Sequence, residues 1–387
     1  MFAPPTPTEH MTVLVTGDDG AVKVSARAEV IAGWHCSVCG PTPVSDRWNA
    51  TVVWTGHEVI LFGGQSGHKL GQIPVDGAAY EPASGQWRPI PPAPGQAGAQ
   101  VAAGWTGAEA IFFGGYENTP PGEFKVTSAA VAYDPRRNTW RVLPVGPLSP
   151  RAGAVAVWTG VELVVAGGYP AVRTDTFGVF SDAAAYQPGA DTWRVLPTLP
   201  DRACPEGADL AYWPLELVYA GDRLIAWRPW QISTTTHDPR GRSVSSRHDI
   251  DRFELTAGAD RWALTVDQDP PRGVRWPIWT GSEVVVPATP PFRGSGSGPA
   301  QFGLRGARLD VGARRWQPIA AGGTGPAAWT GAALVSWTDG VSVWDPDSDT
   351  WAVCGAPVGR PDSDSVAVWT GGQVLLVNAR QLYRLSP

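Results

Sequence analysis

The sequence contains few of the residues that carry metal and redox chemistry. Its 387 residues include only 4 cysteines, 2 methionines and 6 histidines, too few cysteines for a disulfide scaffold in a chain of this length. Charged residues make up 17% of the chain and the formal net charge is −6, which lacks the basic footprint of a nucleic-acid-binding protein. No apolar run is long enough to cross a bilayer, and the first residues, MFAPPTPTEH, lack the basic and apolar segments of a signal peptide. We therefore expect no nucleic-acid partner, no membrane span and a cytoplasmic location, or a secreted one if this is a mature form.

Glycine (46), proline (38) and tryptophan (20) are abundant instead. The first two indicate many turns rather than long helices. The hydrophobic content of 43% is that of a globular protein with a sizeable core.

One phrase that contains tryptophan recurs along the chain. Its clearest copies are VVWTGHEVILFGG at 52–64, AGWTGAEAIFFGG at 103–115 and AVWTGVELVVAGG at 156–168. Weaker copies occupy residues 218–227, 277–288, 327–337 and 367–378, which makes seven, with equivalent aromatic residues 40 to 61 positions apart. This period is typical of propeller blades and too long for short solenoid repeats. Each copy predicts a hairpin, because two apolar strands flank a Thr-Gly turn.

A second phrase follows each of the first six hairpins. It occupies residues 77–91, 130–144 and 183–197, and in weaker form 252–266, 307–320 and 342–355. In its clear copies a strand ends in tyrosine, a turn reverses the chain, and a new strand begins near tryptophan. Four short strands per repeat must stack on neighbours to be stable. We therefore predict an all-β fold, a seven-bladed β-propeller of four-stranded antiparallel blades.

These residues resemble the kelch-repeat β-propeller family, of the bacterial type. The resemblance is carried by the doubled glycine Gly63-Gly64, the turn Tyr133-Asp134-Pro135 and Trp140 six residues after that aspartate. It covers residues 32–387 and is strongest in the first three repeats. In the last four repeats the glycine pair is replaced by Arg228-Pro229, Ala288-Thr289, Thr338-Asp339 and Ala379-Arg380.

The two ends of the repeat region complement one another. The last repeat has its hairpin and a third strand, Gln381 to Leu385, but no outer strand, whereas an unmatched strand, Gly33 to Val38, precedes the first hairpin. We predict that this N-terminal strand closes the ring, with Trp34 beside Tyr383. The interval from Trp34 to Trp54 is 20 residues, compared with 18 in three other repeats. Residues 1–31 form an extension outside the ring, with a possible hairpin at 12–26.

The stretch AGWHCSVCGPTP, residues 32–43, has the spacing of half a zinc site. On a strand, however, Cys36 and Cys39 face opposite sides. A chelating pair needs a turn between its cysteines and a second ligand pair. We favour a structural role without metal or cofactor, and keep metal or redox use as the alternative.

Function is expected on the face that carries the longer connections, because loops vary without disturbing a core. The longest connections run from Arg228 to Asp249 and over residues 291–303. Arginines in the loops that enter the innermost strands could converge at the mouth of the central channel on a carboxylate or phosphate. The alternative is that they tie the blades together through backbone carbonyls. The candidate ligand-binding residues are Arg47, Arg151, Arg202, Arg272, Arg275, Arg360, Trp230, Trp276, Glu206 and Asp209.

The predicted function is that of a binding module, expected to be a monomer, for an acidic small molecule or a peptide or protein partner. The alternative is an enzyme that acts on a sugar acid or modified peptide, as a mutarotase, isomerase or lyase. In that case the arginines would hold the substrate carboxylate, and a loop acid or histidine would be the base.

Overall fold

We describe the chain from a computed structural model, which places residues 10–12, 27–29, 35–66, 73–95, 97–119, 123–170, 179–203, 208–212, 214–238, 241–271, 273–288, 305–337, 340–354, 365–378 and 380–386. Every regular element in these ranges is a β-strand. They contain no helix with the length and apolarity that crossing a membrane requires.

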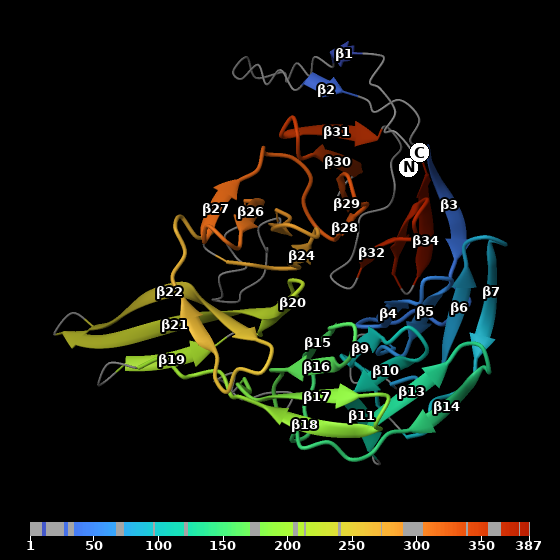
Figure 1. The fold of residues 1–387 in the computed structure, drawn as a ribbon, viewed down its shortest axis with the longest axis horizontal. Helices are drawn as coiled ribbons and strands as arrows, with labels where there is room; N and C mark the ends of the chain where they lie inside the picture. Colours follow the sequence, from blue (N-terminus) through green and yellow to red (C-terminus); the bar gives the residue numbers. More distant parts are fainter. Residues whose placement is uncertain are drawn as a thin grey trace.

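In these ranges, seven antiparallel sheets (blades 1 to 7) follow one another around a central axis (Figure 1). Blade 1 consists of β4 (Thr51–Trp54), β5 (Val59–Phe62), β6 (Gly77–Glu81) and β7 (Gln86–Ile90). Blade 2 consists of β9 (Ala102–Trp105), β10 (Ala110–Phe113), β13 (Ala130–Asp134) and β14 (Thr139–Val142). Blade 3 consists of β15 (Val155–Trp158), β16 (Leu163–Ala166), β17 (Ala183–Gln187) and β18 (Thr192–Leu196). Blade 4 consists of β20 (Glu216–Tyr219), β21 (Arg223–Asp238), β22 (Gly241–Thr256) and β23 (Ala263–Thr265). Blade 5 consists of β24 (Ile278–Trp279), β25 (Val284–Val286), β26 (Ala307–Asp310) and β27 (Arg315–Pro318). Blade 6 consists of β28 (Ala327–Trp329), β29 (Leu334–Trp337), β30 (Val341–Asp345) and β31 (Thr350–Cys354). Blade 7 combines β32 (Val366–Trp369), β33 (Val374–Val377) and β34 (Gln381–Ser386) with β3 (His35–Pro41). This is the arrangement of propeller blades, so the predicted all-β fold of repeated four-stranded sheets is confirmed.

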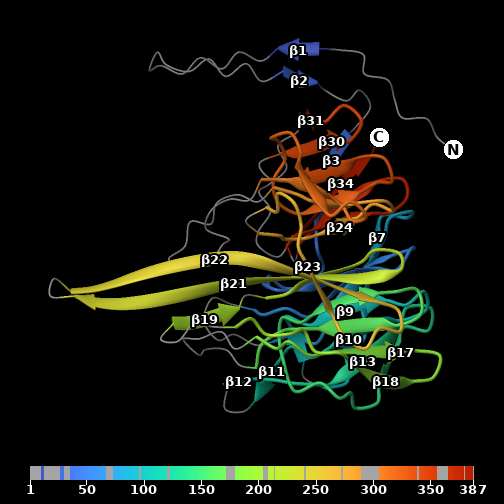
Figure 2. The ribbon, with the colours of Figure 1, turned by 60° about the vertical axis from the view of Figure 1, so that its left-hand side comes forward.

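The connection from Arg228 to Asp249, predicted as a loop, is instead a continuation of blade 4. β21 and β22 are each 16 residues long and pair from Arg223↔Thr256 to Asp238↔Gly241. They form a ribbon that projects from the ring (Figure 2). A further strand, β19 (Ala208–Tyr212), pairs with β21. The prediction was wrong because serines and charged residues are typical of loops, whereas the threonines of this segment favour strands.

Two small sheets lie outside the blades. One joins β8 (Ala97–Ala99), β11 (Tyr116–Thr119) and β12 (Glu123–Val126). In the other, β1 (His10–Thr12) pairs antiparallel with β2 (Arg27–Glu29), and β2 lies beside β31. Apart from Thr12, the predicted hairpin at 12–26 lies outside the described residues, as does the connection at 291–303.

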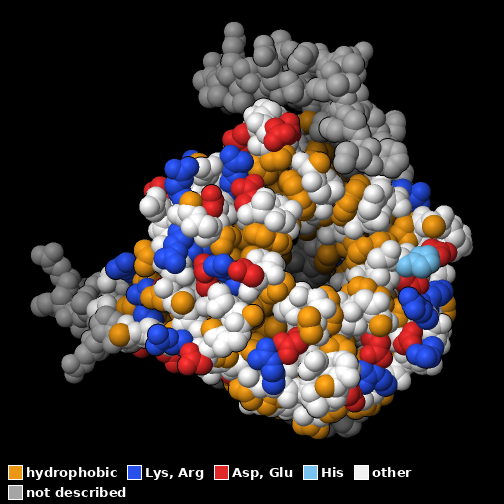
Figure 3. All heavy atoms as spheres, viewed as in Figure 1, with side chains coloured by type: hydrophobic (Ala, Val, Ile, Leu, Met, Phe, Trp, Pro, Cys, Tyr) orange, Lys and Arg blue, Asp and Glu red, His pale blue; other side chains and the backbone are white. Residues whose placement is uncertain are grey.

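The ring surrounds a hollow at its centre (Figure 3). The first strand of each blade lies nearest the axis (Figure 1). The second strands β5, β10, β16 and β33 are buried at every residue. Because adjacent blades cover both faces of these strands, their sequences are apolar throughout instead of alternating.

The Thr-Gly turns and the doubled glycines each have a local cause. The Thr55 hydroxyl donates to the Glu58 carbonyl at 3.0 Å and accepts from the Glu58 N–H at 2.9 Å, and Gly56 has φ +85°. Gly63 has φ +65°, and a Cβ there would lie 1.9 Å from the Gly98 carbonyl oxygen. The glycine pair therefore allows the backbone that leads into blade 2 to approach blade 1.

The outer tryptophans of blades 2, 3, 4 and 6 tie each of these blades to the one before it. The indole N–H of Trp140 donates to the Pro91 carbonyl at 2.7 Å, and that of Trp193 donates to the Pro144 carbonyl at 3.0 Å. Trp262 and Trp351 make the same bond to Pro197 and Ala320. Each bond to a backbone carbonyl contributes about 1 kcal/mol.

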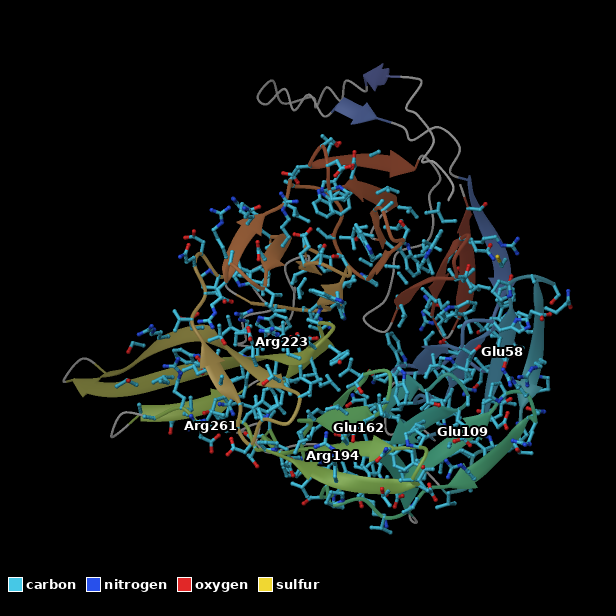
Figure 4. All side chains as sticks on the ribbon, in the orientation of Figure 1. Glu58, Glu109, Glu162, Arg194, Arg223 and Arg261 are labelled. Carbon is cyan, nitrogen blue, oxygen red and sulfur yellow. The ribbon has the colours of Figure 1, made fainter. Side chains whose placement is uncertain are left out.

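Arginines next to these tryptophans form a second set of ties, which we call latches. Arg88 pairs with Glu58 of its own blade at 2.5 Å and donates to the Tyr133 hydroxyl of blade 2 at 2.8 Å. Arg141 repeats this with Glu109 and with Tyr186 of blade 3. Glu58, Glu109 and Glu162 follow the curve of the ring, and Arg194 pairs with Glu162 at 2.6 Å (Figure 4).

The N-terminal strand closes the ring, as predicted, because β3 pairs antiparallel with β34. The predicted register was wrong. Tyr383 lies opposite Val38, whereas Trp34 lies outside the described residues. In this register Cys36, opposite Leu385, occupies the position that Trp87 holds in blade 1.

The closing blade replaces the latch that its outer strand lacks. Ser37 stands where blade 1 has Arg88, and it pairs with Arg384 on β34. Arg384 donates to the Tyr80 hydroxyl of blade 1 at 3.1 Å. Blade 7 therefore carries its inter-blade arginine on its third strand instead of its outer strand, and this arginine still joins the last blade to the first.

Removal of β3 should destroy the ring as a single cooperative unit. A variant that lacks residues 1–41 leaves the edge of β34 without its partner, and exposed edges promote association. We expect a lower and broader thermal transition by circular dichroism, and soluble aggregates by size-exclusion chromatography. The matched control lacks residues 1–34, retains β3 and should unfold like the full chain. Equal behaviour of the two variants would contradict the role of β3.

Candidate functional site

The connections between second and third strands and those between blades lie on one face, which we call the loop face. The predicted arginines precede innermost strands and therefore belong to it. The structure divides them into buried ties and accessible groups.

Arg47 and Arg151 are ties within their blades. Arg151 is 0% exposed; it donates to the Gly167 carbonyl at 3.0 Å and pairs with Asp182 at 2.5 Å. Arg47, 3% exposed, makes the same contacts with the Gly63 carbonyl at 3.1 Å and with Asp76 at 2.8 Å. The guanidinium donors of both arginines are therefore engaged inside the protein.

Arg202 and Trp230 lie together at the base of the ribbon. The Arg202 guanidinium lies 4.0 Å from the Trp230 ring centroid and pairs with Asp251 at 2.6 Å. Trp230 is only 1% exposed, so it packs inside the protein. Asp209 is exposed on β19, away from the innermost strands. The remaining candidates, Glu206, Arg272 and Arg360, lie outside the described residues.

Arg275 and Trp276 lie just before β24, the innermost strand of blade 5, at the end of that strand where the channel mouth is predicted. The Arg275 guanidinium stacks over the Trp276 ring at 4.5 Å. Within the described part of the chain, this guanidinium makes no hydrogen bond. Trp276 has φ +54°, and Asn49 and Gln100, which also lie two residues before an innermost strand, have φ +53° and +54°. This left-handed conformation therefore belongs to the repeat.

Glu216 completes what we call the mouth cluster. It begins β20, the innermost strand of blade 4, and its carboxylate faces the Trp276 backbone N–H and the charge of Arg275. Burial raises the pKa of Glu216 to about 7, although the positive charge of Arg275 and the backbone N–H of Trp276 oppose that shift. A carboxyl group that titrates near neutral pH can exchange protons there.

Sequence reasoning missed Glu216, yet a signal was available. Blades 1 to 3 place Thr51, Ala102 and Val155 at the equivalent start of the innermost strand. An acid at this position in the fourth repeat is therefore a departure from the pattern.

The cysteine stretch forms no metal site in the described residues. Cys39 is a half-buried free thiol that packs near Tyr80. A register shift between Val38 and Gly40 interrupts the alternation that predicted opposite faces for Cys36 and Cys39. The side chains of Cys36 and Cys354, and all of Cys204, lie outside the description. Among the side chains that are placed, no three His, Cys, Asp or Glu residues gather as metal ligands, and the metal or redox alternative stays a prediction.

Comparison with known proteins does not assign this chain to a family. No protein-family model matches the chain, and no curated protein is significantly similar to it in sequence.

Replacement of the tie Arg151 should cost much more stability than replacement of an exposed ion-pair arginine. Arg151→Ala leaves the Gly167 carbonyl without its donor and opens a cavity, which we expect to lower the free energy of unfolding by about 3 kcal/mol. Arg194→Ala, at a side chain 57% exposed, should cost less than about 1 kcal/mol. Urea unfolding of both variants measures the difference. Equal losses would show that Arg151 is not a tie.

Glu216 should make the stability of the protein depend on pH. Below its usual pKa of 4.5 both states are protonated, whereas between 4.5 and about 7 only the unfolded state loses the proton, so stability falls as the pH rises through this range. Glu216→Gln removes this dependence. Urea unfolding at pH 5 and pH 8 should show that the variant gains stability relative to the original protein at the higher pH. A difference that stays constant with pH would contradict the raised pKa.

Proposed function

We propose that this chain is a seven-bladed, kelch-like propeller that binds an acidic small molecule or a peptide carboxylate at the loop-face mouth of its channel. The kelch-like assignment is supported by the doubled glycines, the Tyr-Asp-Pro turn and the regularly placed tryptophans. It is also supported by the packing roles of these residues, since Gly63 allows a close backbone approach and Trp140 joins two blades.

The observation that carries the binding proposal is the state of Arg275. Its guanidinium stacks on Trp276, which fixes its plane, while its N–H groups have no hydrogen-bond acceptor among the described residues. A planar guanidinium held in this way suits the two oxygens of a carboxylate. The half-buried setting strengthens such a bond relative to one in open solvent.

A second candidate function is catalysis at the same mouth, and Glu216 favours it. A carboxyl group with a pKa of about 7 beside Arg275 has the properties of a general base for a substrate whose carboxylate Arg275 holds. Proton abstraction next to that carboxylate is the reaction such a pair supports.

Binding should depend on both the charge and the planarity of residue 275. Glucuronate and galacturonate serve as probes in calorimetric titrations. We expect Arg275→Ala to weaken binding about tenfold or more, since a hydrogen bond to a charged group contributes about 1.5–3 kcal/mol. Arg275→Lys should also weaken it, because lysine lacks the stacked plane.

The control Arg194→Ala changes an arginine on an outer strand and should leave binding intact. Unchanged affinity in both Arg275 variants would refute the proposal. If Glu216→Gln retains the ligand but abolishes turnover of a sugar acid, the protein is an enzyme; if no acid turns over in the original protein, it is a binder.

A further inference from the structure

A separate pocket of about 220 Å³ lies between blades 4 and 5. Strands β21, β22 and β23, the connection to blade 5 and Trp316 of its outer strand line this pocket, whereas no innermost strand contributes. It is therefore distinct from the mouth cluster.

Arg252 is the unusual residue of this pocket. It is 3% exposed and lies on the third strand of its blade, opposite Trp227 and Thr265. The other six blades have small or apolar residues at this position: Gly77, Ala130, Ala183, Gly306, Val341 and Leu382. A buried guanidinium has thus replaced a core residue in one blade.

The guanidinium has ion pairs but no aligned hydrogen bond. Its Nη2 lies 2.9 Å from Glu254 Oε1 and 2.9 Å from Asp267 Oδ1. Nevertheless, Nε, Nη1 and Nη2 all lack a hydrogen-bond partner in the described structure, as do those two carboxylate oxygens. Buried donors and acceptors without partners are rare and costly.

Two neighbouring substitutions make room for a molecule beside Arg252. Thr265, 7% exposed, stands where four other blades bury a larger aliphatic residue: Ile90, Leu143, Leu196 and Ile319. Asp267 Oδ2 accepts the indole N–H of Trp316 at 2.8 Å, a role that backbone carbonyls fill in the other blades described above. Because Thr265 is smaller than the aliphatic residues of the other blades and Asp267 adds a carboxylate, the space here is polar. In the other blades this space is filled by the apolar core.

The chemistry of the lining defines what fits. Arg202 pairs with Asp251, and Arg252 pairs with Asp267 and the adjacent Glu254. Asp249, which also lines the pocket, lies 3.8 Å from Arg247. Each of these charges therefore already faces an opposite charge, which favours a neutral ligand. Among the lining residues, Arg252 Nε and Nη1 and Trp227 Nε1 are donors without a hydrogen-bond partner. Asp267 Oδ1 has an ion-pair contact with Arg252 Nη2 but no aligned hydrogen-bond donor. Hydroxyl groups satisfy both kinds, since each donates and accepts. The apolar walls, Leu264, Pro270, Pro271 and Val274, suit a carbon skeleton.

From this we propose that the pocket between blades 4 and 5 binds a small neutral polyhydroxylated molecule, such as a monosaccharide or cyclic polyol. Adjacent hydroxyls accept from Arg252 and donate to Asp267, and the carbon skeleton lies on the apolar walls. This site does not depend on the proposed function of the channel mouth.

Saturation-transfer NMR with glucose, galactose, mannose and myo-inositol at millimolar concentration tests the proposal. We expect transfer to at least one of them. Thr265→Leu restores the aliphatic core type of the other blades, so it should fold, fill the pocket and weaken binding about tenfold or more. Arg252→Lys keeps the positive charge but removes the fork of donors, and should weaken binding similarly.

Two controls separate this site from others. Thr192→Leu makes the same exchange at an exposed position of β18, and Arg275→Ala alters the channel mouth; both should retain the bound polyol. If no probe binds, or if binding survives Thr265→Leu and Arg252→Lys, the pocket holds only water and the proposal is refuted. If Arg275→Ala abolishes polyol binding, the ligand sits at the mouth and the assignment to this pocket is wrong.

Discussion

The structure depends on the pairing of β3 with β34. Each blade carries a second strand that is apolar on both faces, and such a strand is stable only between two neighbours. An open row of blades would expose one apolar face at each end. The hydrogen bonds between the first and last strands of the ring remove both ends at once, and Arg384 adds the inter-blade contact to Tyr80 that the outer strand of blade 7 cannot make.

The regularity of blades 1 to 3 makes the irregular blades informative. In the regular blades, charged residues form ties within one blade and latches that also reach the next blade. In blade 4 the same positions carry Arg252 in place of alanine or glycine, Thr265 in place of isoleucine or leucine, and Glu216 in place of threonine, alanine or valine. A buried polar residue at a core position needs a compensating contact. Both candidate sites are therefore at the boundary between blades 4 and 5.

Much of the fold could be predicted because the tryptophans, glycine pairs and Thr-Gly turns have local causes that recur with the period. The register in which β3 pairs with β34 was harder to predict. The 18-residue interval of the other repeats leads from Trp54 back to Cys36, which the structure places at the outer-strand position, but the presence of Trp34 two residues earlier favoured the wrong alignment. The ribbon of blade 4 was not predicted, because its polar residues are of the types common in loops although they form one continuous antiparallel ladder between β21 and β22. Sequence alone could not separate Arg151 from Arg275, since burial and partners decide their roles and both precede an innermost strand.

The position of β3 also has a consequence for biosynthesis. This strand is synthesised before every other strand of the ring, yet its partner β34 is synthesised after all of them. While the other blades assemble in order, the N-terminal segment must remain extended and unpaired, and contacts between such distant segments form slowly. A nascent chain interrupted anywhere before residue 381 presents two open flanks at once, so chaperone surveillance of partly translated chains is expected to matter more for this protein than for one of similar size with local topology.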